Sequence, residues 1–207
     1  FTISHPWTGH PQERFLEIHE RLFHLLIVSH DLEFFAHEHP EPAGPGRFRL
    51  RFTFPQPGAY RLLCDFFPEG GTPQMPVKTI LPARSDPRAL WQPAVLKPEP
   101  GPVQDQGLRV SLRTEPAQPL AGLKTLLFFD IDPADGLEPF LGAWGHMLAA
   151  SADLADLIHD HPAIADGGPR VQFNQIFPRP GLYRMWVQFQ RKGRVHTVRF
   201  TVPVLSL

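Results

Sequence analysis

One histidine pattern occurs twice in this chain, and the duplication constrains the fold more than any other feature. In each copy, a histidine is followed by twelve residues, a second histidine, one residue, a third histidine and a proline. The copies are offset by 122 residues, as from His24 to His146. The six histidines are His24, His37 and His39 in the first copy, and His146, His159 and His161 in the second. A repeat of this length predicts two domains derived from one by duplication.

The residues around the first pattern predict a β-hairpin. Residues 22–28 are apolar and include β-branched side chains, which favours a strand. Ser29 and Asp31 then supply side chains that bond nearby backbone amides, as is typical of turns. A second strand follows and ends at Pro40, because proline cannot donate to the ladder.

The hairpin brings the three histidines of each copy together. If the turn is centred near Asp31, His24 lies opposite His39, with Cβ atoms roughly 5 Å apart. His37 lies on the same face as His39 because side chains alternate along a strand. A slip of one residue in this register would scatter the group. The same register predicts a second group formed by His146, His159 and His161.

Three converging imidazoles predict a metal site. Neutral imidazole is a good ligand for zinc, copper, nickel and iron. Three protein ligands leave a fourth position open, which is typical of catalytic or exchangeable sites rather than of closed structural ones. In the alternative interpretation, the histidines end strands and bond to turn carbonyls, with no metal.

Two further residues are candidates for the fourth ligand. Aligning Val77–Pro82 with Val198–Pro203 sets Met75 beside His196. A thioether favours Cu(I), whereas imidazole accepts Cu(II) or zinc, and core packing is the alternative role for Met75. Three histidines near the N-terminus have no counterpart in the second copy and are expected to be exposed: His5, His10 and His19.

Length and composition predict an all-β protein of two tandem antiparallel β-sandwich domains. The chain has 207 residues, 42% of them hydrophobic, and its 25 prolines mostly separate short apolar runs, which favours strands over helices. We expect domain 1 at residues 1–82, a proline-rich linker at 83–106, and domain 2 at 107–207. Trp91 is a candidate anchor for the linker.

A second duplicated motif predicts the core strands. Pro57-Gly58-Ala59-Tyr60 recurs as Pro180-Gly181-Leu182-Tyr183, at an offset of 123, and Pro-Gly is typical of a type II turn. Residues 47–54 alternate polar and apolar side chains, so the arginines there are expected to form a solvated face. The expected core residues are Phe48, Leu50, Phe52, Tyr60, Leu62, Cys64 and Phe66 in the first copy, and Phe173, Tyr183, Met185, Val187 and Phe189 in the second.

Charge and cysteine content exclude several classes of function. The net charge is −1 and the isoelectric point about 6.9, so we expect no general attraction to nucleic acid or anionic membranes. A single cysteine excludes an intrachain disulfide. No apolar stretch approaches the roughly 18 residues of a membrane span. The chain starts at Phe1, as expected of a mature or trimmed product.

These motifs resemble known bacterial domains. The Pro-Gly-x-Tyr strand, the glycine turn and the last strand resemble small immunoglobulin-like (Ig-like) sandwich domains linked to copper handling, including the YtkA-like and copper-resistance C types. The segment from Gly142 to Pro162 resembles uncharacterised secreted bacterial proteins with the same hairpin. The resemblance covers residues 12–82 and 107–204, and implies an Ig-like fold, a periplasmic or extracellular location and a heavy-metal association. The chain lacks the N-terminal histidine of the copper-resistance C type, so that site is not expected here.

Three functions are compatible with the sequence. The first is a periplasmic or secreted metal-binding protein, with copper favoured over zinc, that sequesters the ion or transfers it to a protein partner. The second is a structural or interaction module whose histidines stabilise turns. The third is a metalloenzyme, which is not expected, because the chain has neither a His-Glu-x-x-His motif nor a Gly-x-Ser-x-Gly motif.

Overall fold

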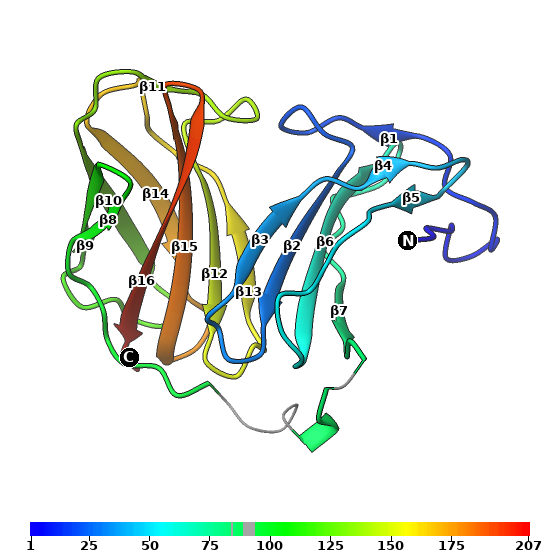
Figure 1. Ribbon diagram of the computed structural model, residues 1–207, viewed down its shortest axis with the longest axis horizontal. Helices are drawn as coiled ribbons and strands as arrows, with labels where there is room; N and C mark the ends of the chain where they lie inside the picture. The colour runs from blue at the N-terminus through cyan, green and yellow to red at the C-terminus, as the bar shows by residue number, and fades with distance from the viewer. Residues whose placement is uncertain (84, 89–93) are drawn as a thin grey trace. The chain divides into compact units, whose positions relative to one another are not determined.

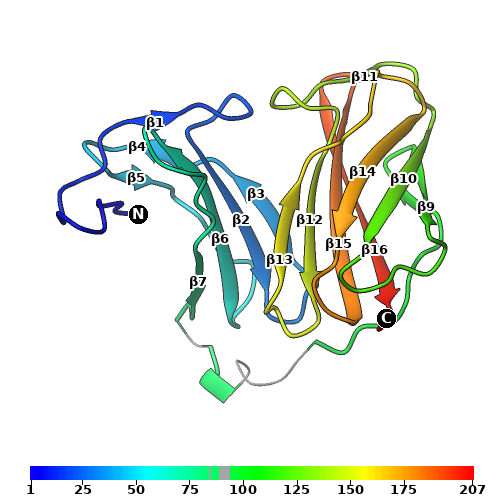
Figure 2. The same ribbon diagram turned by 180° about the vertical axis from the view of Figure 1, so that it is seen from behind.

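The computed structural model describes residues 1–83, 85–88 and 94–207 of the chain. The chain divides into two compact units, Phe1–Gln92 and Pro93–Leu207, here called unit 1 and unit 2. Antiparallel sheets build both units (Figure 1; Figure 2), and 52% of the residues lie in strands. Among the described residues, no helix is long and apolar enough to cross a membrane. The all-β fold class is therefore confirmed.

Unit 1 is organised around the neighbouring strands β2 and β6. Its strands are β1 (Phe15–Leu16), β2 (Phe23–Ser29), β3 (Phe35–Glu38), β4 (Glu41–Pro42), β5 (Phe48–Arg49), β6 (Tyr60–Pro68) and β7 (Val77–Ile80). The main sheet has the order β1-β6-β2-β3, with β7 paired to β6, while β4 pairs with β5. The core is formed by Phe23, Leu25, Ile27, Phe48, Tyr60, Leu62, Cys64 and Phe66.

Unit 2 is a sandwich of two sheets. Its strands are β8 (Val103–Asp105), β9 (Leu108–Glu115), β10 (Lys124–Asp132), β11 (Leu137–Glu138), β12 (His146–Ser151), β13 (Leu157–Asp160), β14 (Arg170–Ile176), β15 (Gly181–Arg191) and β16 (Arg194–Val204). One sheet has the order β14-β10-β9-β8, and the other β11-β15-β12-β13, with β16 paired to β15. Side chains from both sheets, such as Phe129 and Phe173 from the first and Met185 and Phe200 from the second, form one core.

Each unit has its own sheet with the histidine hairpin, and the two sheets have the same strand order around it. Strands β2, β3, β6 and β7 correspond to β12, β13, β15 and β16. The hairpins pair through equivalent residues, because Leu25 faces Glu38 and Met147 faces Asp160. The duplication inferred from the repeated sequence is therefore visible in the strand pairing.

The predicted core residues are buried, with two exceptions in unit 1. Leu50 and Phe52 are only half-buried, although both pack against the core. The strand expected over residues 47–54 is reduced to β5, because this segment pairs with β4 at only two positions. The equivalent strand β14 pairs with β10 along its whole length. The second layer of unit 1 is thus much less regular than that of unit 2.

The same hydrogen-bonded loop closes both hairpins. The Ser29 hydroxyl donates to the Asp31 carboxylate, and the Ser151 hydroxyl donates to Asp153 at 2.6 Å. Each serine oxygen also accepts a backbone N–H from across the loop. Both loops contain a buried leucine with positive φ, Leu32 and Leu154. The turn predicted from the Ser-x-Asp pattern is confirmed.

Much of the expected linker belongs to unit 2. Ala94 donates its N–H to the Ala152 carbonyl at 3.0 Å, and Glu99 exchanges backbone hydrogen bonds with Thr201. Strand β8 then joins the first sheet of this unit. The prolines between these contacts do not prevent pairing, because other residues supply the N–H groups. The expected anchor Trp91 lies outside the described residues.

Cys64 occupies a core position whose equivalent in unit 2 is Val187. The thiol is buried, and desolvation by burial raises its pKa to about 11, so it is neutral at physiological pH. We expect Cys64→Val to change the free energy of unfolding by less than about 1.5 kcal/mol, because volume-conserving core substitutions are tolerated. Urea denaturation measures this, with Val187→Cys as the reciprocal control. A loss of several kcal/mol would contradict the equivalence of the two positions.

Asp153 makes the loop of the second hairpin sensitive to acid. Desolvation raises the pKa of this carboxyl, but hydrogen bonds from Ser151, Arg179 and the N–H of Ala155 outweigh that effect and lower the pKa to about 2. The folded pKa lies below the ordinary value, so the ionised group stabilises the fold above about pH 4, and this stability is lost as the pH falls toward 2.

We therefore expect Asp153→Asn to be less stable than the parent near neutral pH. Between about pH 5 and pH 2, the variant should lose less stability than the parent does. Urea denaturation across this range tests the prediction. An equal loss in the two proteins would show that Asp153 does not carry the acid sensitivity of the loop.

Candidate metal centres

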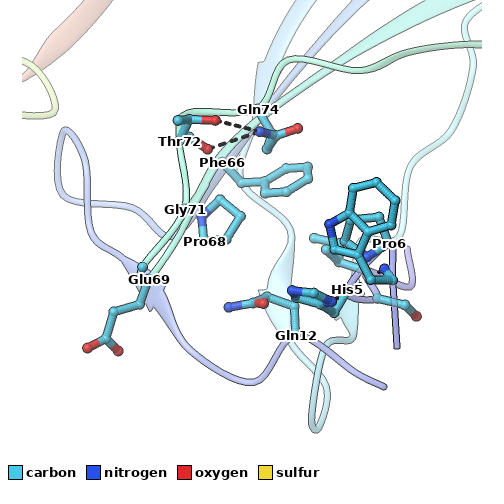
Figure 3. A pocket seen from close by; sticks show the side chains of 13 residues that line it. His5, Pro6, Gln12, Phe66, Pro68, Glu69, Gly71, Thr72 and Gln74 are labelled. Atoms are coloured by element: carbon cyan, nitrogen blue, oxygen red, sulfur yellow. Dashed lines mark hydrogen bonds between the residues drawn. The ribbon is translucent and has the colours of Figure 1, made fainter. Parts of the chain in front are cut away.

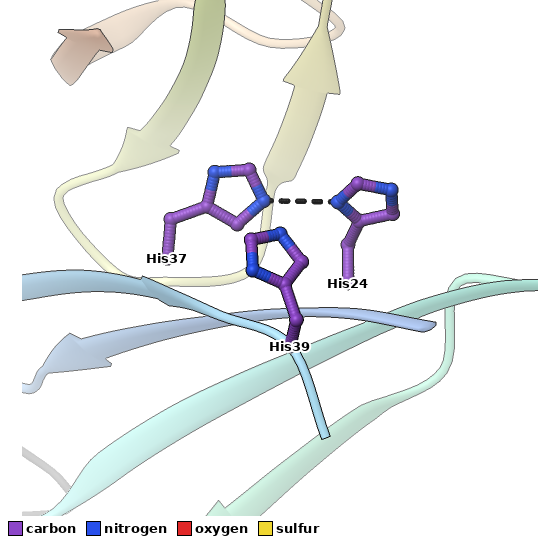
Figure 4. A group of neighbouring side chains, drawn as sticks. All are labelled: His24, His37 and His39. Atoms are coloured by element: carbon purple, nitrogen blue, oxygen red, sulfur yellow. Dashed lines mark hydrogen bonds between the residues drawn. The ribbon is translucent and has the colours of Figure 1, made fainter. Parts of the chain in front are cut away.

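The first three histidines converge at the open end of the hairpin in unit 1. His24 lies in β2, His37 lies in β3, and His39 follows directly after β3. One ring nitrogen from each lies within 4.8 Å of the others. His24 Nδ1 is 3.1 Å from His37 Nε2, and the His39 ring lies beside both (Figure 4). We call this group the first triad.

Unit 2 repeats this arrangement with His146, His159 and His161, here called the second triad. One ring nitrogen from each again lies within 4.8 Å of the other two. His146 and His24 are almost fully buried, at 2% and 3% exposure, while the other four histidines are half-buried. Both predicted triads are therefore brought together.

The predicted hairpin register is also confirmed. Leu25 pairs with Glu38, one step from His24 and His39, and Met147 pairs with Asp160 in the same way. Leu25 and Met147 point into the cores, so the neighbouring histidines project from the opposite face of each sheet. Burial raises the pKa of the Glu38 and Asp160 carboxyls, which lie on the core-facing side.

A backbone carbonyl fixes the orientation of one histidine in each triad. His24 Nε2 lies 2.9 Å from the carbonyl oxygen of Ile18, and His146 Nε2 lies 2.7 Å from that of Phe140. A carbonyl only accepts, so Nε2 carries the proton and Nδ1 keeps its lone pair. Histidines that ligate metals commonly donate their other N–H in this way, which sets the tautomer and orients the ring.

Two matching tight turns hold these carbonyls in place. Ile18 exchanges backbone hydrogen bonds with Arg21, and Phe140 does so with Ala143. The two central residues of each turn have positive φ, as in a type I′ turn: His19, Glu20, Leu141 and Gly142. Three of these four residues are not glycine, and a positive φ costs energy in residues other than glycine. The arrangement is nevertheless found in both units.

Sequence reasoning missed these turns, although one signal was present. Ile18 precedes His24 by six residues, and Phe140 precedes His146 by six. Every residue has a backbone carbonyl, so the residue types do not show which carbonyl binds the histidine. Only this spacing and the glycine at position 142 indicated the turns. His19 was expected to be exposed, but its ring is half-buried, with its centroid 6.4 Å from that of His24.

His196 does not belong to the second triad. It pairs with Phe189, whose side chain lies in the core, whereas His146 pairs with Gln188 on the other face of the sheet. His196 is buried, and its Nδ1 lies 3.0 Å from the carboxylate of Asp105. The predicted role as a fourth ligand is therefore wrong.

Met75 lies on the same face as the first triad but two strands away. Hydrogen bonds of Pro76 and Gln74 with β6 place Met75 across from Asp65, which in turn pairs with His24. Strand spacing then separates the Cα atoms of Met75 and His24 by roughly 10 Å, and Met75 is 53% exposed.

The alignment that set Met75 beside His196 was wrong by one residue. Leu63 and its equivalent Trp186 pair with Val77 and Arg199. Met75 therefore corresponds to Thr197, and a shift of one residue moves a side chain to the other face.

The neighbours of the two triads differ in charge. Asp65 on β6 lies across from His24, and Gln188 on β15 lies across from His146. Paired residues on adjacent strands point to the same face. The first triad thus has a carboxylate on its β6 side, where the second has an amide whose nitrogen donates to Thr197 at 3.2 Å.

The triads are geometrically suited to a transition-metal ion. Ring nitrogens bound to one tetrahedral ion at ~2.0–2.1 Å lie roughly 3.3 Å from one another. The nitrogens of His24 and His37 are already 3.1 Å apart, and a ring nitrogen of His39 lies within 4.8 Å of the other two members of the triad. Each triad would supply three neutral ligands and leave one position open.

A separate cavity in unit 1 contains no triad residue. It has a volume of about 560 Å³ and lies between the N-terminal segment, including His5 and Trp7, and the end of β6 near Phe66 (Figure 3). His5 and His10 are exposed, as expected, and join through a backbone hydrogen bond. They form no three-ligand group among the described residues.

Comparison with known proteins adds a family but no activity. No curated protein matches the chain. One family model, described as a domain of unknown function (DUF8832), matches residues 1–80 and 103–206, which is most of the chain and includes both triads. The protein therefore belongs to the DUF8832 family.

Proposed function

We propose that the protein binds two transition-metal ions, one at each histidine triad. The favoured ion is copper, with zinc as the alternative. In this proposal the protein sequesters the ion or transfers it to a protein partner, in the periplasm or outside the cell, and is not an enzyme. The resemblance to copper-handling domains remains part of the proposal, because the matched family has no assigned function.

The observation that carries the proposal is the carbonyl-held histidine in both units. His24 and His146 each donate Nε2–H to a backbone carbonyl six residues earlier. In each triad, one ring nitrogen of this histidine lies within 4.8 Å of one ring nitrogen of each of the other two imidazoles. A histidine that donates one N–H to a backbone carbonyl and has two other imidazoles converging beside it is arranged as expected of a metal ligand.

The ligand set supports copper or zinc over harder ions. Magnesium and calcium prefer oxygen ligands, whereas three neutral imidazoles suit copper and zinc. For a given nitrogen site, copper(II) binds more tightly than zinc. An open fourth position would allow an incoming ligand to take the ion, which supports transfer over permanent structural binding.

The structural alternative explains part of the geometry. A histidine that only stabilises a turn would also donate to the carbonyl of Ile18 or Phe140. That role concerns one histidine in each unit and gives no reason for two more imidazoles to gather beside it. Metal binding accounts for all three positions in both copies.

Metal titration of single-histidine variants tests the proposal. We expect the parent protein to bind two copper or zinc ions, His39→Ala and His161→Ala to bind one each, and the double variant to bind none. The exposed His10→Ala is the matched control and should bind two. Elemental analysis of protein purified without an affinity tag gives the number of metal ions bound per chain. An unchanged stoichiometry in both single variants would favour the structural alternative.

Stability measurements separate ligand loss from unfolding. His24→Ala removes a buried ring and leaves the Ile18 carbonyl without its donor, so we expect the metal-free protein to lose about 2–4 kcal/mol. His37→Ala removes a half-buried ring and should cost less than about 1 kcal/mol. Urea denaturation without metal measures both. If the two variants lost equal stability, the carbonyl bond would not be the anchor of the first triad.

A further inference from the structure

The first triad borders an open cavity that is lined by arginine. The cavity has a volume of about 600 Å³ and is lined by His39, Glu41, Arg49, Leu50 and Arg51. The β4–β5 ladder pairs Glu41 with Arg49, and Pro40 joins this ladder to His39. His39 of the first triad and the two arginines therefore line one cavity.

In unit 2, the positions equivalent to these two arginines carry neutral amides. The bridge between Ile164 and Gln172 in unit 2 is equivalent to the pair Glu41 and Arg49, at an offset of 123. Arg49 and Arg51 thus correspond to Gln172 and Asn174. These two amides form a hydrogen bond with each other, in which Gln172 Nε2 donates to Asn174 Oδ1 at 2.9 Å. The triads are alike, but their surroundings differ in charge.

The arginines are available for a ligand. Neither Arg49 nor Arg51 forms an ion pair with any residue in the described part of the chain, and both are exposed. Glu41 offsets one of the two positive charges in the cavity. The other carboxylate near this triad, Asp65, lies across β2 from His39, because His24 stands between them in the register. The side of the triad next to His39 therefore has a net positive charge.

We propose that the first triad binds its metal ion together with a small oxyanion, a carboxylate or a phosphate. One oxygen of the anion occupies the open position on the metal, and its other oxygens accept hydrogen bonds from Arg49 and Arg51. Guanidinium groups recognise carboxylate and phosphate through paired, charge-assisted hydrogen bonds. An anion also offsets the charge of a divalent ion that three neutral imidazoles leave uncompensated. The second triad binds its metal without this co-ligand.

This inference rests on the proposed function, and variants that retain one triad allow the two to be tested separately. The full chain with His161→Ala keeps the first triad, and the full chain with His39→Ala keeps the second. Each is loaded with less than one equivalent of Cu(II) in a buffer without coordinating anions. Inorganic phosphate or acetate is then added, and the visible absorption and electron paramagnetic resonance spectra of the copper are followed.

We expect the spectrum of the first triad to change and saturate with added phosphate or acetate. The second triad should require at least about tenfold more anion. Adding Arg49→Gln and Arg51→Asn to the His161→Ala chain should weaken its anion response about tenfold or more and leave copper binding unchanged in anion-free buffer. Adding Gln172→Arg and Asn174→Arg to the His39→Ala chain should strengthen its response.

The possible failures are distinguishable. If the His161→Ala chain bound no copper, the proposed function would fail before any anion was added. If copper bound but both triads responded equally to anions, the co-ligand inference would be wrong. A loss of copper binding on replacing the arginines in anion-free buffer would also overturn it, because the arginines would then support the triad itself. Different responses to phosphate and acetate would identify which oxyanion the cavity accepts.

Discussion

The pairing register of the two hairpins determines whether a metal site can exist in this protein. Leu25 faces Glu38, and Met147 faces Asp160, so the leucine and the methionine enter the cores while the histidines project from the other face. A slip of one residue would send the histidines into the core and the apolar side chains out of it. Such a slip would expose apolar side chains that are now buried, and this energetic cost keeps the three imidazoles together. The Ser-x-Asp loop at the closed end of the hairpin fixes the same register through its hydrogen bonds.

The register could be predicted because several independent signals agree on it. The apolar run of β2, the turn chemistry of Ser29 and Asp31, and the stop at Pro40 all place His24 across from His39. The last strand had fewer signals. Loops between the repeats change the offset from 122 to 123 and back, so a motif match over six residues aligned Met75 with His196. The observed pairs show that Met75 matches Thr197, and that His196 points into the core.

Other features had no signature in residue types. The carbonyls of Ile18 and Phe140 orient the buried histidines, but any residue could supply a carbonyl oxygen. The positive φ of His19 and Glu20 is likewise hidden, because neither residue is glycine. The alternating pattern of residues 47–54 predicted burial correctly in part, but it could not show that this segment finds a partner only in β4. An alternating sequence pattern indicates which side chains face a core, but it does not indicate how many strands pair with the segment.

The comparison of the two units within one chain separates what the triads share from what they do not. The shared parts are the three imidazoles, the carbonyl six residues before the first of them, and the type I′ turn that presents this carbonyl. The neighbours differ: Asp65 and Gln188 on the central strand, and Arg49 and Gln172 on the other side. If the histidines served only to close turns, differences in charge around them would have little consequence. If they hold an ion, each change alters the charge balance at the open position, so the two triads would bind the same metal with different co-ligands.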